Sequence, residues 1–144
     1  MAMRTQIEHR LGIQAPADRI WELVSELDKW EHWNPIHPGA SGKIGFGQTL
    51  QVVEAYPGEE RRTIEAKVAE WQPREQLVWR TQGFMSVWLR FLEIEELGPT
   101  NCIFSNGVVV DGFLGKREAK QRKQALKLGF GILGEAIKEK AERA

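Results

Sequence analysis

The chain has a single cysteine, no long apolar run and no excess of charge of either sign. Cys102 stands alone among 144 residues, so no internal disulfide can form, which suits a reducing compartment. Twenty basic and twenty acidic residues leave no net charge, so composition gives no support for nucleic acid or a membrane surface as a partner. The N-terminus lacks the apolar segment of a signal peptide, and no run approaches the length of a membrane span. We therefore expect a cytoplasmic protein that binds no nucleic acid and does not insert stably into a membrane.

Residues that hold metals or catalyse reactions are also sparse. His9, His32 and His37 are scattered and match no metal-binding spacing, so we expect no metal and no cofactor. His32 and His37 flank a Trp-Asn-Pro turn beside Glu31 and could share a mouth with a carboxylate, although surface positions are commoner for such histidines. Cys102 is expected to be a small, inert, buried residue. The sequence therefore assigns no catalytic residue.

The periodicity of apolar residues predicts a strand, two short helices, six strands and one long helix. Short turns between consecutive strands favour an antiparallel meander, and no linker divides the chain. We expect one α+β domain spanning residues 1–144. The expected strands are 6–13, 41–44, 48–56, 62–71, 77–82, 86–97 and 100–110, and the expected helices are 15–27, 28–33 and 114–144.

The last helix carries glycines within its apolar pattern. One face is formed by Leu126, Phe130, Leu133 and Ile137, spaced as in an amphipathic helix. Gly129, Gly131 and Gly134 interrupt it, each at a cost of about 1 kcal/mol relative to alanine. Either a neighbouring backbone comes close to the helix, or side-chain volume is withheld, which a hollow beneath the helix would require. The alternative to a hollow is tight packing of the helix on the sheet.

Several short motifs carry a family resemblance. They are IQAPADRIW at 13–21, WEHWNP at 30–35, VAEWQP at 68–73, LVW at 77–79, and Gly112 after the last strand. In this order the chain resembles the START-related helix-grip superfamily, which includes polyketide cyclases and aromatase-like proteins, plant pollen allergens and lipid-transfer domains. The resemblance implies a curved antiparallel sheet of six to seven strands wrapped around a long C-terminal helix. It also implies a deep, mostly apolar cavity between sheet and helix that holds a hydrophobic or amphipathic small molecule.

Eight residues form the candidate ligand-binding set for such a cavity. Strand alternation places Trp79 with Leu77, and it places Phe104 with Asn106, on a single face of each strand. Trp33 could cover one end of the cavity, as the matching position does in relatives, or pin the short helix to the sheet. The alternative is that these aromatic side chains fill the core solidly. The set is Trp33, Trp79, Trp88, Arg90, Phe104, Asn106, Phe130 and Leu133.

Arg90 is the sharpest polar candidate, because it lies between Trp88 and Leu92 in strict alternation. A buried guanidinium needs a partner, which could be a carboxylate, phosphate or phenolate of a ligand. It could equally form a salt bridge within the protein, or be turned to solvent by a bulge. The carboxylates considered for that salt bridge are Glu54, Glu65 and Glu70.

A basic cluster begins the last helix, with Glu118 its only acidic residue. It comprises Lys116, Arg117, Lys120, Arg122, Lys123 and Lys127. The cluster could attract an anionic partner or a lipid surface, but a solvated helix face is the favoured account.

These observations favour a carrier or binding protein for a hydrophobic small molecule. The alternative is an enzyme resembling the polyketide cyclases and aromatases, in which Arg90 or a histidine assists enolate chemistry. A third interpretation is a protein-interaction module with a vestigial cavity. The sequence does not select an oligomeric state.

Overall fold

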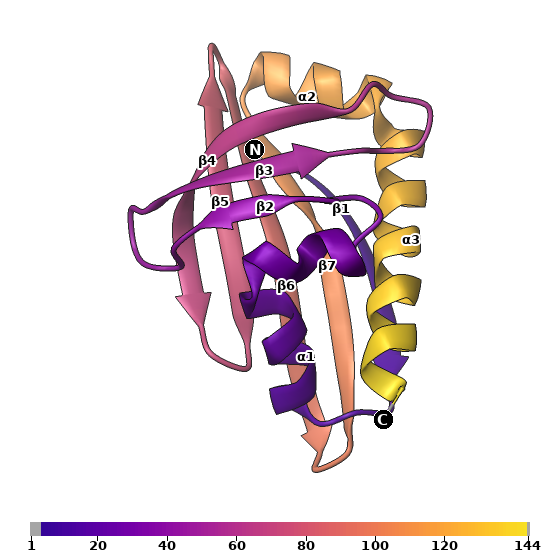
Figure 1. The fold of residues 1–144 in the computed structure, drawn as a ribbon. Helices are drawn as coiled ribbons and strands as arrows, with labels where there is room; N and C mark the ends of the chain where they lie inside the picture. Colours follow the sequence, from indigo (N-terminus) through magenta and orange to yellow (C-terminus); the bar gives the residue numbers. More distant parts are fainter. Residues whose placement is uncertain (1–3, 144) are drawn as a thin grey trace.

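A strongly curved antiparallel sheet wraps around a C-terminal helix in the computed structural model, which describes residues 4–143 (Figure 1). The strands are β1 (Arg4–Ile13), β2 (Ala40–Gly42), β3 (Thr49–Glu54), β4 (Arg62–Gln72), β5 (Gln76–Gly83), β6 (Ser86–Gly98) and β7 (Asn101–Asp111). The helices are α1 (Ala17–Ser25), the 3₁₀ helix η1 (Leu27–His32), α2 (Phe113–Gln121) and α3 (Lys123–Glu142). All strand pairs are antiparallel, in the order β1-β7-β6-β5-β4-β3-β2. The predicted helix-grip architecture and element order are confirmed.

The short helices begin and end where backbone chemistry requires it. Pro16 precedes α1 with a φ of −68°, close to the only value its ring allows. The helix η1 ends at His32, with Trp33 as its capping residue before Asn34 and Pro35, because a residue before proline is disfavoured in helix. Asn34 then fixes the following turn, since its side-chain oxygen accepts hydrogen bonds from the backbone N–H groups of Ile36 and His37.

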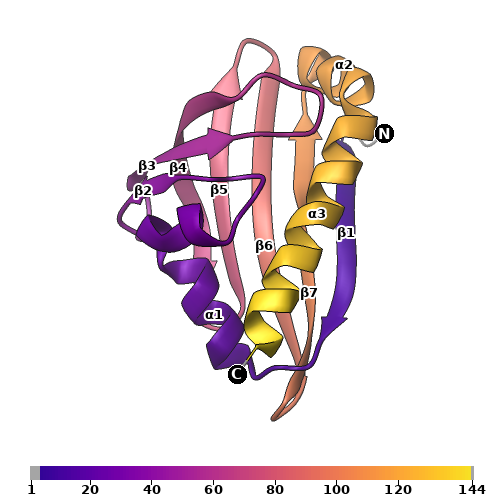
Figure 2. The same ribbon diagram turned by 45° about the vertical axis from the view of Figure 1, so that its right-hand side comes forward.

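The expected single helix over 114–144 is wrong at one point, because it is divided at Arg122. The backbone of Arg122 has φ −97° and ψ 3°, which departs from helical geometry and separates α2 from α3. Figure 2 shows α2 lying across the end of the sheet, while α3 runs along its concave face. The side chain of Arg122 is held away from α3 by Glu59 in the β3–β4 loop, a contact that local periodicity cannot reveal.

The concave face of the sheet and the inner face of α3 form the core. The predicted inward row of α3 is buried throughout, from Leu126 and Phe130 to Leu133 and Ile137. Strand alternation also places side chains as expected, with Trp79, Trp88 and Phe104 all buried. Burial of such large apolar side chains is the main force that holds α3 against the sheet.

The glycines of α3 admit neighbouring side chains. A Cβ atom on Gly129 would lie 2.6 Å from Cδ1 of Tyr56, and one on Gly134 would lie 2.9 Å from Nδ1 of His9. Both distances are far shorter than a van der Waals contact, so Tyr56 and His9 occupy the volume that these glycines leave. The approaching atoms belong to side chains and not to a neighbouring backbone, so tight packing of the helix on the sheet is found at Gly129 and Gly134.

A pair of alanine substitutions tests this packing. Gly129→Ala is expected to destabilise the fold by about 1–3 kcal/mol, because the new methyl group overlaps the buried Tyr56 ring. Gly131→Ala is the matched control: its Cβ would meet His9 at an ordinary 3.6 Å, so helix propensity should stabilise the fold by up to about 1 kcal/mol. Urea denaturation measures both. Equal stabilisation by the two substitutions would contradict close packing at Gly129.

Candidate functional site

A hollow opens where strands β4 and β5 separate. Their pairing ends at Lys67 and Arg80; beyond it, residues 62–66 of β4 pair only with β3, and residues 81–83 of β5 pair only with β6. The hollow at this split has a volume of about 320 Å³. Its lining comes from β4, β5, β6 and α2 and includes Arg62, Ile64, Thr81, Gly83, Ser86, Trp88, Arg90 and Glu118.

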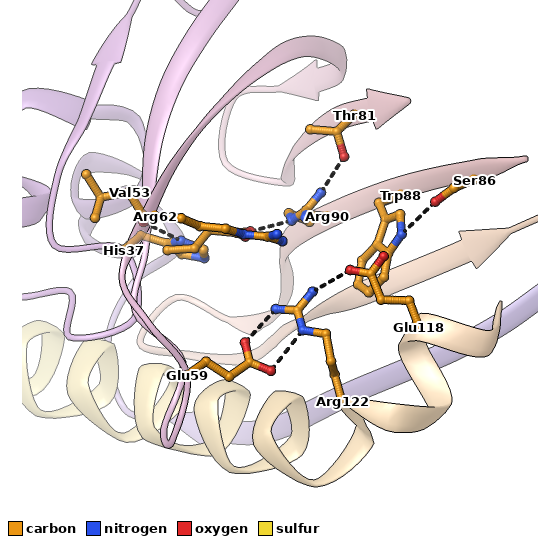
Figure 3. Close-up of polar contacts among 11 residues, drawn as sticks. His37, Val53, Glu59, Arg62, Thr81, Ser86, Trp88, Arg90, Glu118 and Arg122 are labelled. Atoms are coloured by element: carbon orange, nitrogen blue, oxygen red, sulfur yellow. Dashed lines mark hydrogen bonds and ion pairs between the residues drawn. The ribbon is translucent and has the colours of Figure 1, made fainter. Parts of the chain in front are cut away.

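Arg90 lies at the inner side of this hollow and is only 4% exposed. Its Nε donates a hydrogen bond of 2.6 Å to Glu54, and its Nη1 donates one of 2.9 Å to the hydroxyl of Thr81 (Figure 3). The guanidinium also lies 5.2 Å from the centre of the Trp88 ring, within cation–π range. Of the three carboxylates considered from the sequence, Glu54 is therefore the partner of Arg90.

Glu54 joins strands that are not neighbours in the sheet. It ends β3, which is separated from β6 by β4 and β5, and only the curl of the sheet carries it over Arg90. The Glu54 carboxylate also accepts a hydrogen bond of 3.0 Å from Arg62, whose side chain is about half exposed. Burial alone raises the pKa of Glu54, but the charges of Arg90 and Arg62 lower it more, so the net shift is downward and the carboxylate is charged.

His37 is buried beside this ion pair. Its Nδ1 lies 3.1 Å from the backbone oxygen of Val53, and a carbonyl can only accept, so Nδ1 carries the proton in the neutral ring. The imidazole lies 5.6 Å from the Trp79 ring and 5.9 Å from the Trp30 ring, measured between centroids. Burial lowers the pKa of His37 from 6.5 to about 4. The side chain is therefore neutral at physiological pH.

Tyr56 completes the inner side of the site. Its ring centre lies 6.0 Å from that of His37 and 5.8 Å from that of Phe130, in edge-on geometry. Burial, together with the charge of Glu54, raises the pKa of Tyr56, so the phenol stays protonated. A neutral phenol and a neutral imidazole thus lie next to a buried ion pair, in the core adjoining the hollow and outside its lining.

Arg122 closes the side of the site that faces α2. It donates hydrogen bonds of 2.9 and 2.8 Å to the two carboxylate oxygens of Glu59, and it pairs with Glu118 at 3.3 Å (Figure 3). Its guanidinium also lies over the rings of Tyr56 and Trp88, at 5.4 and 5.2 Å. Arg122 therefore ties the β3–β4 loop, the start of α3 and the aromatic wall of the hollow together.

The candidate set from the sequence is divided between the hollow and the core. Trp88 and Arg90 line the hollow. Trp33 is half-buried, with its ring centre 6.5 Å from that of Trp30, so it packs on the short helix η1. The other five residues, all buried, are Trp79, Phe104, Asn106, Phe130 and Leu133. A role of the eight in ligand binding stays a prediction.

Two of these buried residues have a polar atom without a partner in the described part of the chain. Asn106 donates from Nδ2 to the backbone oxygen of Phe130 at 3.0 Å, but its Oδ1 accepts no hydrogen bond. The indole N–H of Trp79 likewise has no acceptor. Buried polar atoms are almost always hydrogen-bonded, so these two are unusual, as are the corresponding atoms of His9, Trp33, Asn34 and Trp71.

Sequence reasoning missed His37 and Tyr56. The expectation of a surface position holds for His32, which is exposed, and is wrong for His37, which is 2% exposed. The sequence contains a signal for Tyr56. It stands at every second position with Leu50, Val52 and Glu54, which predicts one face of a strand, and all four residues are buried. Cys102 is buried, as expected, and burial raises the pKa of its thiol.

The ion pair can be tested by comparing two substitutions, one at the buried Glu54 and one at the half-exposed Arg62. Glu54→Gln leaves the buried Arg90 without its counter-charge, and it should destabilise the fold by about 3–5 kcal/mol. Arg62→Gln removes the half-exposed partner of the same carboxylate and should cost no more than about 1 kcal/mol. Denaturation of both variants measures the contrast. Similar losses from the two would show that the Arg90–Glu54 contact does not dominate.

The buried imidazole should make stability depend on pH. The unfolded chain takes up a proton on His37 below about pH 6.5, whereas the folded chain does so only near pH 4, so stability falls as pH drops through this window. Between about pH 7.5 and about pH 5 the loss from this group is about 2 kcal/mol. His37→Asn keeps a donor for Val53 and all carboxylates, and it should abolish that part of the pH dependence in urea denaturation. An unchanged pH dependence in this variant would contradict the assignment.

Known proteins with this architecture include both enzymes and other proteins. The Zhui aromatase/cyclase from Streptomyces sp. R1128 superposes with a TM-score of 0.74 at 14% identity, covering 97% of this chain and 94% of its own. Truncated norcoclaurine synthase from Thalictrum flavum has a TM-score of 0.69 at 15% identity, covering 98% and 95%. Major latex-like protein 151 from Panax ginseng has a TM-score of 0.76 at 9% identity, covering 97% and 99%. At these identities the likeness establishes the fold alone.

The sequence itself carries the family assignment. No curated protein sequence matches the chain significantly. The sequence pattern described as "Polyketide cyclase / dehydrase and lipid transport" matches residues 4–134, which is most of the chain. The matched segment runs from the first residue of β1 into α3 and so includes every element that lines the hollow. The chain therefore belongs to the polyketide cyclase/dehydrase and lipid transport family, within the START-related helix-grip superfamily.

Proposed function

We propose that the protein binds a hydrophobic or amphipathic small molecule that enters through the split between β4 and β5. The observation that carries the proposal is that this split opens onto Trp88 and Arg90, an aromatic wall beside a buried guanidinium. Small-molecule sites typically combine apolar walls with a few fixed polar groups. The volume of about 320 Å³ lies at the small end of such sites, so the bound part is a ring system or a short chain.

The polar side of the hollow favours an oxygen-bearing end on the ligand. Arg90 uses two of its five N–H donors on Glu54 and Thr81, which leaves others for a ligand oxygen. Arg62 adds a second guanidinium at the mouth, while both share the single carboxylate of Glu54. Glu65 and Glu118 also line the hollow, so its charges are of both signs, and we propose a ligand whose oxygen-bearing group, such as a phenolate or carbonyl, is directed to Arg90.

The core behind the hollow offers further hydrogen bonds. The free indole N–H of Trp79 can donate, and the free Oδ1 of Asn106 can accept. A ligand that reached these atoms would satisfy polar groups that otherwise cost about 1–3 kcal/mol each when buried alone.

A cyclase or aromatase activity is the second candidate, favoured by the placement of His37 and Tyr56 next to the ion pair. The neutral phenol could donate to an enolate oxygen, and the unprotonated nitrogen of His37 could accept a proton. However, a base whose pKa is about 4 is poorly matched to proton transfer near neutral pH. We therefore place binding before catalysis.

The proposal can be tested with one blocking substitution and a control on the same strand. Ile64 lines the hollow, whereas its neighbour Thr63 is exposed. Ile64→Trp should fill the entrance and weaken binding of anilinonaphthalene sulfonate, an aromatic anion, by about tenfold or more, equivalent to 1.4 kcal/mol. Thr63→Trp should bind this probe as the unmodified protein does.

Native mass spectrometry of the purified protein would identify a retained ligand directly. A bound lipid, polyketide or aromatic acid that is lost from Ile64→Trp and kept by Thr63→Trp would support the entrance. A ligand-free mass, together with equal probe binding by both variants, would overturn the proposal and favour a filled core.

A further inference from the structure

One end of the molecule combines exposed apolar side chains with unpaired cations. The turn between β5 and β6 and the start of α2 lie together at this end (Figures 1 and 2). They are joined by hydrogen bonds of 3.1 and 3.2 Å from the backbone N–H groups of Leu114 and Gly115 to the backbone oxygen of Met85. We call this surface the α2 face, and define it by Phe84, Met85, Phe113, Leu114, Lys116, Arg117, Lys120 and Lys123.

The apolar part of the α2 face is unusual in its exposure. Phe84 is 81% exposed and Phe113 is 58% exposed, and Met85 and Leu114 lie next to them. Half of the large hydrophobic side chains that are exposed within residues 4–143 are on this face. Single exposed apolar residues are ordinary on protein surfaces, but clusters of them are not. The grouping therefore indicates a surface that binds a membrane or another molecule.

The cations beside these residues have no protein partner. In the part of the chain described, Arg122 pairs with Glu59 and Glu118, whereas Lys116, Arg117, Lys120 and Lys123 have no carboxylate within ion-pair distance. Residues 113–127 contain six basic side chains and one acidic side chain, although the whole chain has no net charge. The compensating acidic residues lie in other parts of the sequence, so charge is unevenly distributed along the chain although its net charge is zero.

A hollow of about 540 Å³ separates the cations from β1. Ile7 and Ala119, both buried, form part of its lining, with Phe113, Lys116, Lys120 and Lys123 around it. Apolar surface flanked by lysines matches a lipid, whose acyl region is apolar and whose headgroup oxygens bind ammonium groups. A neutral bilayer would leave the cations without a partner, and a polyanion without apolar groups would leave the apolar side chains in water.

We infer that the α2 face docks reversibly on an anionic phospholipid bilayer, with Phe84 and Phe113 inserted at the headgroup boundary and the four cations on the phosphates. This inference is independent of the ligand proposed above. Within residues 4–143 no helix is long and apolar enough to cross a membrane.

Vesicle co-sedimentation of the whole chain tests the inference. The protein should bind vesicles of phosphatidylcholine mixed with phosphatidylserine, bind pure phosphatidylcholine weakly, and be released by salt. Lys120→Gln with Lys123→Gln should lower the partition coefficient about 25-fold, because each cation near an anionic surface contributes about fivefold. Phe84→Ser with Phe113→Ser should lower it by about tenfold or more.

The loop between β2 and β3 provides a matched control, because it also has an exposed phenylalanine and a lysine. Phe46 is 72% exposed, and this loop lies at the left edge of Figure 1, away from α2. Phe46→Ser with Lys43→Gln should leave vesicle binding unchanged. No binding of the unmodified protein to phosphatidylserine vesicles, or equal losses in all three variants, would overturn the inference. A dimer in solution that Phe84→Ser with Phe113→Ser abolishes, without vesicle binding, would assign the face to a second copy instead.

Discussion

The buried ion pair between Arg90 and Glu54 is the contact on which the rest of the site depends. Both side chains are almost inaccessible to water, at 4% and 1% exposure, so neither charge is tolerable without the other. The pair can form only if the sheet curls enough to bring the end of β3 over β6. The same curl places His37 and Tyr56 beside the pair and leaves β5 diverging from β4. The ion pair, the positions of His37 and Tyr56, and the separation of β5 from β4 therefore all depend on the curvature of the sheet.

Tight packing beneath α3 determines where a ligand can be received. Gly129 admits the ring of Tyr56, and that ring in turn contacts Phe130 and His37. The volume beside this part of the helix is therefore taken by aromatic side chains, whereas a hollow of about 320 Å³ opens at the split between β4 and β5. The packing of the sheet against α3 and the candidate ligand site are therefore separate features of this protein. Side-chain contacts hold the sheet against α3, whereas the hollow forms where the pairing of β4 with β5 ends.

Most of the fold could be predicted from the sequence, because strand alternation and helical spacing are local. Alternation also put Arg90 on the inner face, and Glu54 was among its considered partners. The choice of Glu54 could not be made, because it depends on curvature across four strands. His37 was misjudged for a similar reason: its burial follows from the turn held by Asn34, which directs the chain back under the sheet. Arg122, at which the last helix is divided, pairs with Glu59, which is 63 residues away. Contacts of this range leave no periodic signal.

Tyr56 has a consequence for how the interior can be observed. It is the only tyrosine in the chain, and it is 4% exposed. Because burial raises its pKa, its phenolate forms only when water reaches the core. The ultraviolet absorbance of tyrosinate in alkaline solution therefore reports on a single buried position, with no background from surface tyrosines. The tyrosinate absorbance of Tyr56 therefore measures the opening of the core beside the Arg90–Glu54 ion pair.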